Sequence, residues 1–209
     1  MNMEPNAPKW LELARELFSI SQSGLTYCKN EYDLHNYRRL QEISAEIIAN
    51  ESSLSLQSVK DIFSMQAGYA TPKIDVRGAV IRDGKILLVQ EKADGKWAMP
   101  GGWADIGETP SEMVEREVLE ESGFRVCASK VIAVYDANRA EPMEFFHAYK
   151  IIFLCEIISG EACPDHEILA VDFFDPANLP PLSTARTNET MLLEVFAHLQ
   201  SPSRPTAFD

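Results

Sequence analysis

The stretch GGWADIGETPSEMVEREVLEESGF, residues 101–124, determines where one helix must begin and end. Thr109 and Glu112 have the spacing of a capping box, in which each side chain bonds to the backbone N–H of the other residue. Pro110 stands at the first helical position, where its missing N–H costs nothing. Gly123 supplies the left-handed residue that commonly follows the last turn. The sequence therefore predicts a helix that begins at Pro110 and ends just before Gly123.

Three glutamates of this predicted helix, Glu117, Glu120 and Glu121, are three and four positions apart and so share one face. Like charges at this spacing destabilise a solvated helix by a few tenths of a kcal/mol per pair, and more where the site is partly buried. Arg116 offsets part of the repulsion, but one arginine cannot neutralise the whole segment. A hard divalent cation can, because Mg²⁺ prefers carboxylate and carbonyl oxygens. Three glutamates alone also fit a solvated acidic face.

The N-terminal third of the chain has helical periodicity. Apolar residues recur every three or four positions from Lys9 to about Asn50, with Gly24 as a candidate break. Residues 52–58 are rich in serine and indicate a loop, and a short helix is predicted from Val59 to Met65. We therefore expect residues 1–69 to form a small helical unit.

Strand patterns begin after residue 70. Residues 76–81 and 86–89 read as two strands joined by an Asp83-Gly84 hairpin turn. The later predicted elements are strands at Val126–Tyr135, Phe146–Ile158 and Leu169–Phe174 and a helix at Glu189–Leu199. This order predicts an α+β fold with a mixed sheet between helices. Residues 201–209 are polar and rich in proline, which indicates a flexible tail.

Charge and composition disfavour several classes of protein. The 209 residues carry a net charge of −13, which repels polyanions, so binding of nucleic acid or of an anionic membrane is not expected. The N-terminus lacks a basic segment followed by an apolar run, and no apolar run reaches the roughly 18 residues of a membrane-spanning helix, so we expect a cytoplasmic protein. The scattered cysteines and histidines indicate neither a disulfide framework nor a zinc site.

The acidic segment resembles the Nudix box at every position that this motif specifies. The matching residues are Gly102, Glu108, Arg116, Glu117, Val118, Glu120, Glu121, Gly123 and Phe124. Asp105 is a departure, because many relatives carry glutamate there, although the motif does not fix that position. The resemblance extends from Asp75 to about Leu199 through the stretches VRGAVIRDGKILLVQE, KWAMPGGW and FFDPANLPPLS.

This resemblance implies a fold and a domain organisation. Residues 70–200 are expected to form a Nudix hydrolase domain, an α/β/α sandwich with a mixed sheet. Residues 1–69 resemble the helical N-terminal extension of a subgroup that acts on X-linked nucleoside diphosphates such as ADP-ribose and CDP-choline. The apolar faces of these helices lead us to expect a homodimer, or packing of the helices on the Nudix domain.

The resemblance also implies hydrolysis of a diphosphate linked to another group, with Mg²⁺ or Mn²⁺ as cofactor. Glu117 and Glu121 are the first expected metal ligands, followed by Glu120 and the carbonyl of Gly102. Arg116 is expected to pair with Glu108 and so tie the loop to the helix as a support for these ligands. The general base is left open between Glu120 and Glu167.

Several residues outside the box are candidates for substrate binding. Arg77 could contact phosphate, and aromatic residues could stack on a base. The aromatic and imidazole candidates are Trp97, Trp103, Tyr135, Phe146 and His147. Packing in the core is the alternative role for each aromatic side chain.

Three functions are compatible with these residues. The first is hydrolysis of small nucleoside diphosphate-X substrates, which the N-terminal extension favours. The second is removal of oxidised nucleoside triphosphates, and the third is a non-catalytic module that senses nucleotide sugars. The presence of every box carboxylate disfavours the sensor.

Overall fold

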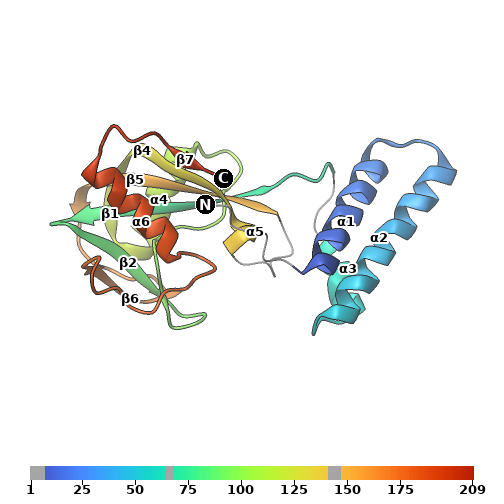
Figure 1. Ribbon diagram of the computed structural model, residues 1–209, viewed down its shortest axis with the longest axis horizontal. Helices are drawn as coiled ribbons and strands as arrows, with labels where there is room; N and C mark the ends of the chain where they lie inside the picture. Colours follow the sequence, from blue (N-terminus) through green and yellow to red (C-terminus); the bar gives the residue numbers. More distant parts are fainter. Residues whose placement is uncertain (1–7, 65–67, 141–146) are drawn as a thin grey trace. The chain divides into compact units, whose positions relative to one another are not determined.

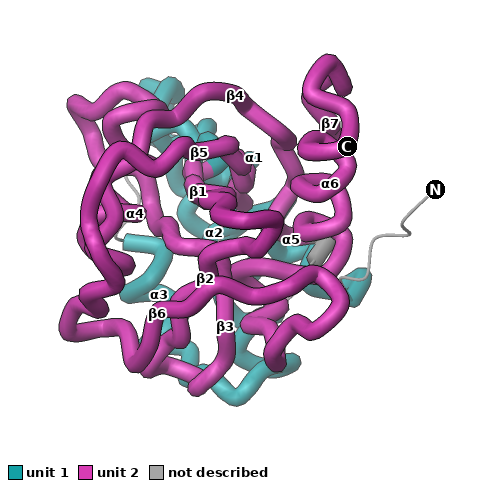
Figure 2. Tube along the Cα trace, turned by 90° about the vertical axis from the view of Figure 1, so that its left-hand side faces the viewer, with its two compact units in different colours: residues 1–72, 142–146 teal, residues 73–141, 147–209 magenta. Residues whose placement is uncertain are grey.

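The computed structural model describes residues 8–64, 68–140 and 147–209. These residues form two compact units, a helical one up to residue 72 and a larger one from residue 73 onward (Figure 2). No helix within the described ranges is long and apolar enough to cross a membrane.

The helical unit consists of α1 (Lys9–Tyr27), α2 (Glu31–Glu51) and α3 (Leu56–Ser64). Figure 1 shows α1 and α2 side by side as a helical hairpin. The rings of Phe18 and Phe63 stack with centroids 3.9 Å apart, and the Ser44 hydroxyl donates a hydrogen bond of 2.7 Å to the Ala14 carbonyl. These contacts join all three helices around a small apolar core.

Two local predictions in this unit need correction. Gly24 does not break the first helix, because α1 continues to Tyr27. A Cβ atom at Gly24 would lie 2.4 Å from the ring of Tyr37, so the glycine permits close packing of the helical pair. The serine-rich segment is not wholly a loop either, because the Ser55 hydroxyl accepts a hydrogen bond from the Ser58 N–H and starts α3.

The larger unit is built on a mixed sheet. Its helices are α4 (Pro110–Ser122), α5 (Ala137–Ala140) and α6 (Glu189–Gln200), and its strands are β1 (Lys73–Arg82), β2 (Lys85–Glu91), β3 (Trp97–Ala98), β4 (Phe124–Asp136), β5 (Ala148–Gly160), β6 (Ile168–Phe174) and β7 (Ala207–Phe208). The strand order is β3-β2-β1-β5-β4-β7, with β6 paired to β2. β1 runs parallel to β5, and β4 runs parallel to β7, while the other pairs are antiparallel.

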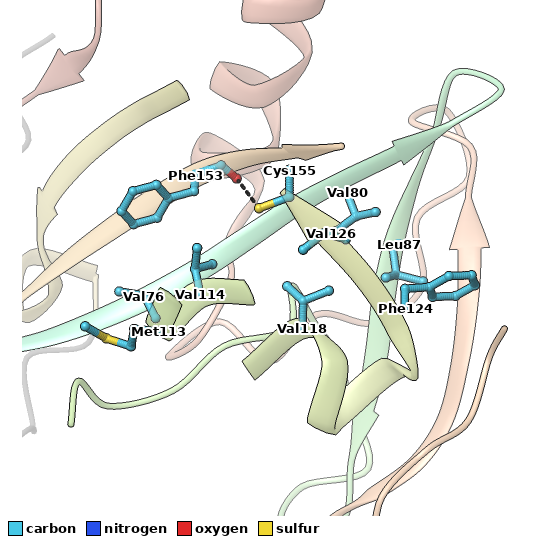
Figure 3. Close-up of a cluster of buried hydrophobic side chains, with 10 residues drawn as sticks. All are labelled: Val76, Val80, Leu87, Met113, Val114, Val118, Phe124, Val126, Phe153 and Cys155. Carbon is cyan, nitrogen blue, oxygen red and sulfur yellow. Dashed lines mark hydrogen bonds between the residues drawn. The ribbon is translucent and has the colours of Figure 1, made fainter. Parts of the chain in front are cut away.

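Alternate residues of the central strands face two different cores. Val76 and Val80 of β1 pack with Val114 and Val118 of α4 (Figure 3). Ala79 of β1 belongs instead to the cluster beneath α6, which lies across the other face of the sheet (Figure 1). The predicted α/β/α sandwich with a mixed sheet is confirmed.

Residues 201–209, predicted to be a flexible tail, instead form β7 and its lead-in. Ala207 pairs with Ala133 of β4. The Thr206 hydroxyl donates a hydrogen bond of 2.9 Å to the Val131 carbonyl, and the Arg204 guanidinium forms two bonds to the Glu194 carboxylate. These contacts join residues distant in sequence, so local composition could not indicate them.

Candidate active site

The helix that carries the acidic residues has the predicted limits. The Thr109 side chain accepts a bond from the Glu112 N–H, and the Glu112 carboxylate accepts one of 2.9 Å from the Thr109 N–H. Gly123 has φ of 80° and donates its N–H to the Leu119 carbonyl. The caps therefore fix α4, and the helix fixes the relative positions of its glutamates.

Arg116 is the centre of an ion-pair cluster beside α4. Its Nε and Nη2 atoms donate to the two oxygens of Glu108 at 2.8 and 2.9 Å, which is the predicted pair. Its Nη1 donates at 2.9 Å to both Glu117 and Glu120. The hydrogen bond from Arg116 lowers the pKa of the Glu108 carboxyl, and the same bond raises the pKa of the guanidinium. The loop before α4 is thus tied to the helix through one arginine.

Glu121 faces the loop on its other side. Its Oε2 accepts a hydrogen bond of 2.8 Å from the Gly101 N–H. Gly101 has φ of 146°, and a Cβ atom there would lie 1.9 Å from the Val76 carbonyl oxygen, so only glycine fits. Burial raises the pKa of the Glu121 carboxyl to about 8, because the Gly101 N–H and the Arg77 charge compensate only in part.

Glu117 lies against the neighbouring glycine. A Cβ atom at Gly102 would stand 3.0 Å from Oε2 of Glu117. Burial raises the pKa of the Glu117 carboxyl, although Arg116 opposes this shift. The Gly102 carbonyl accepts a hydrogen bond of 2.8 Å from the Val76 N–H, which leaves its second lone pair for another partner.

The predicted metal ligands are neighbours, but their carboxylates do not converge on one point. Glu121 turns toward Gly101, while Glu117 and Glu120 turn toward Arg116. Within the described part of the chain, no three acidic, histidine or cysteine side chains are arranged to hold a metal ion. The donors are nevertheless hard oxygens, and two of the carboxyls are buried without full charge compensation. This donor chemistry fits a hard divalent cation.

A buried ion pair beneath the loop was not found from the sequence. The Nε and Nη2 atoms of Arg77 donate to the two carboxylate oxygens of Asp75 at 2.9 and 2.8 Å, which makes a two-bond fork. Arg77 also donates to the Met99 carbonyl at 3.2 Å. Both side chains are buried, and Arg77 is one of the charges that act on Glu121. A contact between Arg77 and a substrate phosphate would require this fork to open, so that role stays a prediction.

Glu91, at the end of β2, is a second carboxylate that sequence reasoning missed. It is buried and forms an ion pair of 3.1 Å with Arg186. Burial raises the pKa of its carboxyl, while the charges of Arg186 and Arg77 lower it and that of Glu167 raises it. An acidic residue that closes an apolar strand is the only sequence signal for this position.

Glu167 and Trp103 lie at exposed positions. The Glu167 carbonyl accepts a hydrogen bond of 3.0 Å from the Lys92 N–H, directly after β2, while its side chain is solvent-exposed. Trp103 is 49% exposed, and its backbone forms a single antiparallel β-bridge with the backbone of Asp75. The loops that contain Glu167 and Trp103 therefore border β2 and β1, the strands that carry the buried Glu91 and Arg77. The roles of the two residues in base catalysis and substrate binding remain predictions.

Tyr135 and His147, two of the predicted substrate residues, line one cavity of about 310 Å³ with Asp136 and Phe208. The His147 imidazole lies 3.4 Å from the Asp136 carboxylate. Trp97 instead packs edge-on against Phe174 with ring centroids 4.6 Å apart, which is the alternative packing role. Phe146 lies outside the described residues.

Comparison with known proteins identifies the family. The NUDIX domain family matches residues 72–195, which is more than half of the chain. The chain belongs to the Nudix family. Residues 8–63 of this Nudix hydrolase also match a family described as a UDP-X-like, N-terminal oligomerisation domain. The predicted Nudix subgroup with a helical N-terminal extension is confirmed.

Individual relatives extend the likeness over nearly the whole Nudix chain. A Bacillus subtilis protein named "Putative ADP-ribose pyrophosphatase YjhB" is 40% identical over 202 residues, which cover 96% of this chain and 97% of the relative. The crystal structure of a UDP-X diphosphatase is 28% identical with a TM-score of 0.63, and the match covers 96% and 98% of the two chains. An ADP-ribose pyrophosphatase structure from Streptococcus suis is 37% identical with a TM-score of 0.62, and it covers 66% of this chain and all of its own.

Proposed function

We propose that this Nudix hydrolase cleaves the diphosphate of nucleoside diphosphate-X substrates of the ADP-ribose, UDP-sugar or CDP-choline type, with Mg²⁺ or Mn²⁺ as cofactor. The observation that carries the proposal is the pair Glu117 and Glu121, held one turn apart on α4 and both partly desolvated. The names of the relatives support the substrate class. The reaction would release two phosphorylated products.

The residues of α4 and of the loop before it would have different roles in the reaction. Glu117 and Glu121 would hold the metal, with Glu120 and the Gly102 carbonyl as further donors. A bound divalent metal offsets phosphate charge and lowers the pKa of a bound water. Arg116 neutralises part of the carboxylate repulsion. The proton acceptor would be Glu120 or Glu167, both of which have exposed side chains.

The cavity lined by Tyr135 and His147 would receive one end of the substrate. Tyr135 pairs in register with Lys150 of β5, and Lys150 pairs with Asp75 of β1. Neighbouring strands are about 4.8 Å apart, so Tyr135 in the cavity is about 10 Å across the sheet from Asp75. Asp75 lies on β1, the strand that also carries Arg77. A nucleoside diphosphate is long enough to span that separation.

The helical unit would form a homodimer. Leu13, Ile20 and Tyr27 recur every seven residues on α1 and are all exposed. Residues at this spacing form one stripe along a helix, as at helix–helix interfaces. The match to an oligomerisation domain supports a second copy of the chain as the partner.

A hydrolysis assay tests the activity. Products are measured with a coupled phosphatase for ADP-ribose, a UDP-sugar, CDP-choline and a nicotinamide dinucleotide. An oxidised nucleoside triphosphate is followed with a coupled inorganic pyrophosphatase, because a phosphatase would remove its terminal phosphate directly. We expect metal-dependent cleavage of one or more of the diphosphate-X compounds at a higher kcat/KM than of the triphosphate. Preference for the triphosphate would favour nucleotide cleansing. Binding without turnover of any compound would favour a sensor.

A further inference from the structure

The loop at residues 181–187 is bonded to the segment that leads into the site. The Ser183 N–H donates to the Trp97 carbonyl at 2.8 Å, and the Met99 N–H donates to the Thr187 hydroxyl at 2.9 Å. Neither bond belongs to the long strands or helices. The loop therefore fixes the path of the backbone immediately before Gly101.

That segment in turn holds the charged groups of the site. The Met99 carbonyl accepts from Arg77, and the Gly101 N–H donates to Glu121. A shift of the segment would change the hydrogen bond that orients the Glu121 carboxylate. The loop at residues 181–187 can thus act on Glu121 through this segment.

Arg186 anchors this loop to the end of β2. Its Nε lies 3.1 Å from Oε1 of Glu91, and its Nη1 donates to the Ser183 hydroxyl at 3.1 Å. The Ser183 hydroxyl donates in turn to Asp94 at 2.8 Å. The Glu91 side chain is only 10% exposed, so its charge depends on this partner. Nearby, Lys150 donates to the loop carbonyl of Ala185 at 2.7 Å.

We propose that Arg186 and Glu91 are a positioning pair for the metal site, and that the guanidinium fork of Arg186, rather than its charge alone, keeps Glu121 in the arrangement that binds a divalent cation. The role rests on the proposed function, because it concerns the same carboxylates. Partners that orient metal ligands commonly change metal affinity by about 10- to 100-fold when they are removed.

Charge and positioning make opposite predictions for this pair. Neutralising Arg186 removes a positive charge from beside Glu91, whose own charge acts on Glu121, and by Coulomb's law alone this change would tighten cation binding. Loss of positioning would weaken it. Replacement by lysine keeps the charge but loses the planar fork, so a pure charge effect would leave affinity unchanged.

Mn²⁺ binding without substrate, measured by the electron paramagnetic resonance of the free ion, separates these cases. We expect Arg186→Lys and Arg186→Gln both to bind Mn²⁺ at least about 10-fold more weakly than the wild type. Arg39→Lys is the matched control, because Arg39 also forms ion pairs with carboxylates, those of Glu42 and Glu46, but on α2. It should bind Mn²⁺ as the wild type does. Circular dichroism checks that each variant is folded.

The outcomes distinguish the two proposals. Unchanged affinity in Arg186→Lys, or tighter binding in Arg186→Gln, overturns the positioning role and leaves the proposed hydrolase intact. A wild-type chain that binds no Mn²⁺ overturns both. If Arg186→Gln does not fold, the conservative lysine variant still decides. With the best substrate, the positioning role further requires that saturating metal restores a large part of the lost kcat in Arg186→Lys.

Discussion

Glu121 stands out among the single residues because its surroundings oppose its charge. Burial, Glu91 and Glu117 disfavour the ionised carboxylate, while the Gly101 N–H and Arg77 favour it. A bound cation would reverse this balance. The same carboxylate is therefore expected to serve catalysis and to reduce the stability of the metal-free protein.

The first prediction at this scale is the effect of Glu121→Gln. The change keeps the shape and the acceptor for the Gly101 N–H but removes the charge, so turnover should fall by at least about a thousandfold. Glu115→Gln is the control, because Glu115 also lies on α4 and accepts a backbone N–H, from Ala128, at 2.9 Å. Steady-state kinetics at saturating Mg²⁺ should separate the two variants. Near-normal kcat in Glu121→Gln would remove Glu121 from the ligand set.

The second prediction concerns stability against pH in the presence of chelator. The pKa of Glu121 is near the ordinary value of 4.5 in the unfolded chain, whereas burial raises it to about 8 in the folded protein. The folded state binds more protons between these values, so the free energy of unfolding should fall as the pH rises through this window. Denaturant melts at pH 5.5 and pH 8.5 measure this difference. It should shrink in Glu121→Gln and when Mg²⁺ replaces the chelator; equal pH dependence in all three samples would contradict the assignment.

At the scale of elements, the short loop before α4 is as important as the helix. Its backbone passes so close to β1 that any side chain at residue 101 would overlap the Val76 carbonyl. The loop supplies an N–H to Glu121, and its Gly102 lies against the Glu117 carboxylate. The site is thus formed by one helix and one turn of chain that cannot move independently.

We expect Gly101→Ala to destabilise the protein far more than Gly107→Ala. Both glycines have positive φ, but nothing lies within 4 Å of a Cβ at Gly107. Alanine at residue 107 should cost the conformational penalty alone, about 1–2 kcal/mol. Alanine at residue 101 adds a backbone collision and should exceed about 4 kcal/mol, or displace the loop and weaken metal binding. Equal losses in urea melts would show that the loop accommodates the added methyl group.

Local signals predicted elements well, and contacts between distant segments could not be predicted. The limits of α4 follow from Thr109, Pro110 and Gly123, whose capping chemistry acts within a few residues. The strand β7 and the Glu91 to Arg186 pair depend on tertiary packing, so no periodicity reveals them. Gly24 illustrates the same limit, because glycine is needed there to make room for the ring of Tyr37 on another helix. The carboxylates and the offsetting charge of Arg116 were predicted, but the Gly101 N–H that binds Glu121 was not.

The whole molecule combines a helical unit with a Nudix unit, and the proposed dimer belongs to the first. Replacing Leu13 and Ile20 together by glutamine removes two apolar contacts of the stripe on α1. We expect this double variant to be monomeric at a concentration where the wild type is a dimer by light scattering. Leu193→Gln is the control, since Leu193 is equally apolar and 69% exposed but lies on α6. An unchanged mass for the double variant would place the interface elsewhere.

The parallel pairing of β1 with β5 has a further consequence for how the protein matures during synthesis. Residues 73–80 of β1 cannot pair until residues 148–155 of β5 have been synthesised. The loop at residues 181–187, which holds the segment before Gly101, is synthesised later still. Contacts of such long sequence separation form slowly, because loop closure must precede them. The hairpin of α1 and α2, by contrast, needs only its own residues. A nascent chain on the ribosome would therefore acquire its helical unit early and its hydrolytic capacity only when almost all of it has emerged.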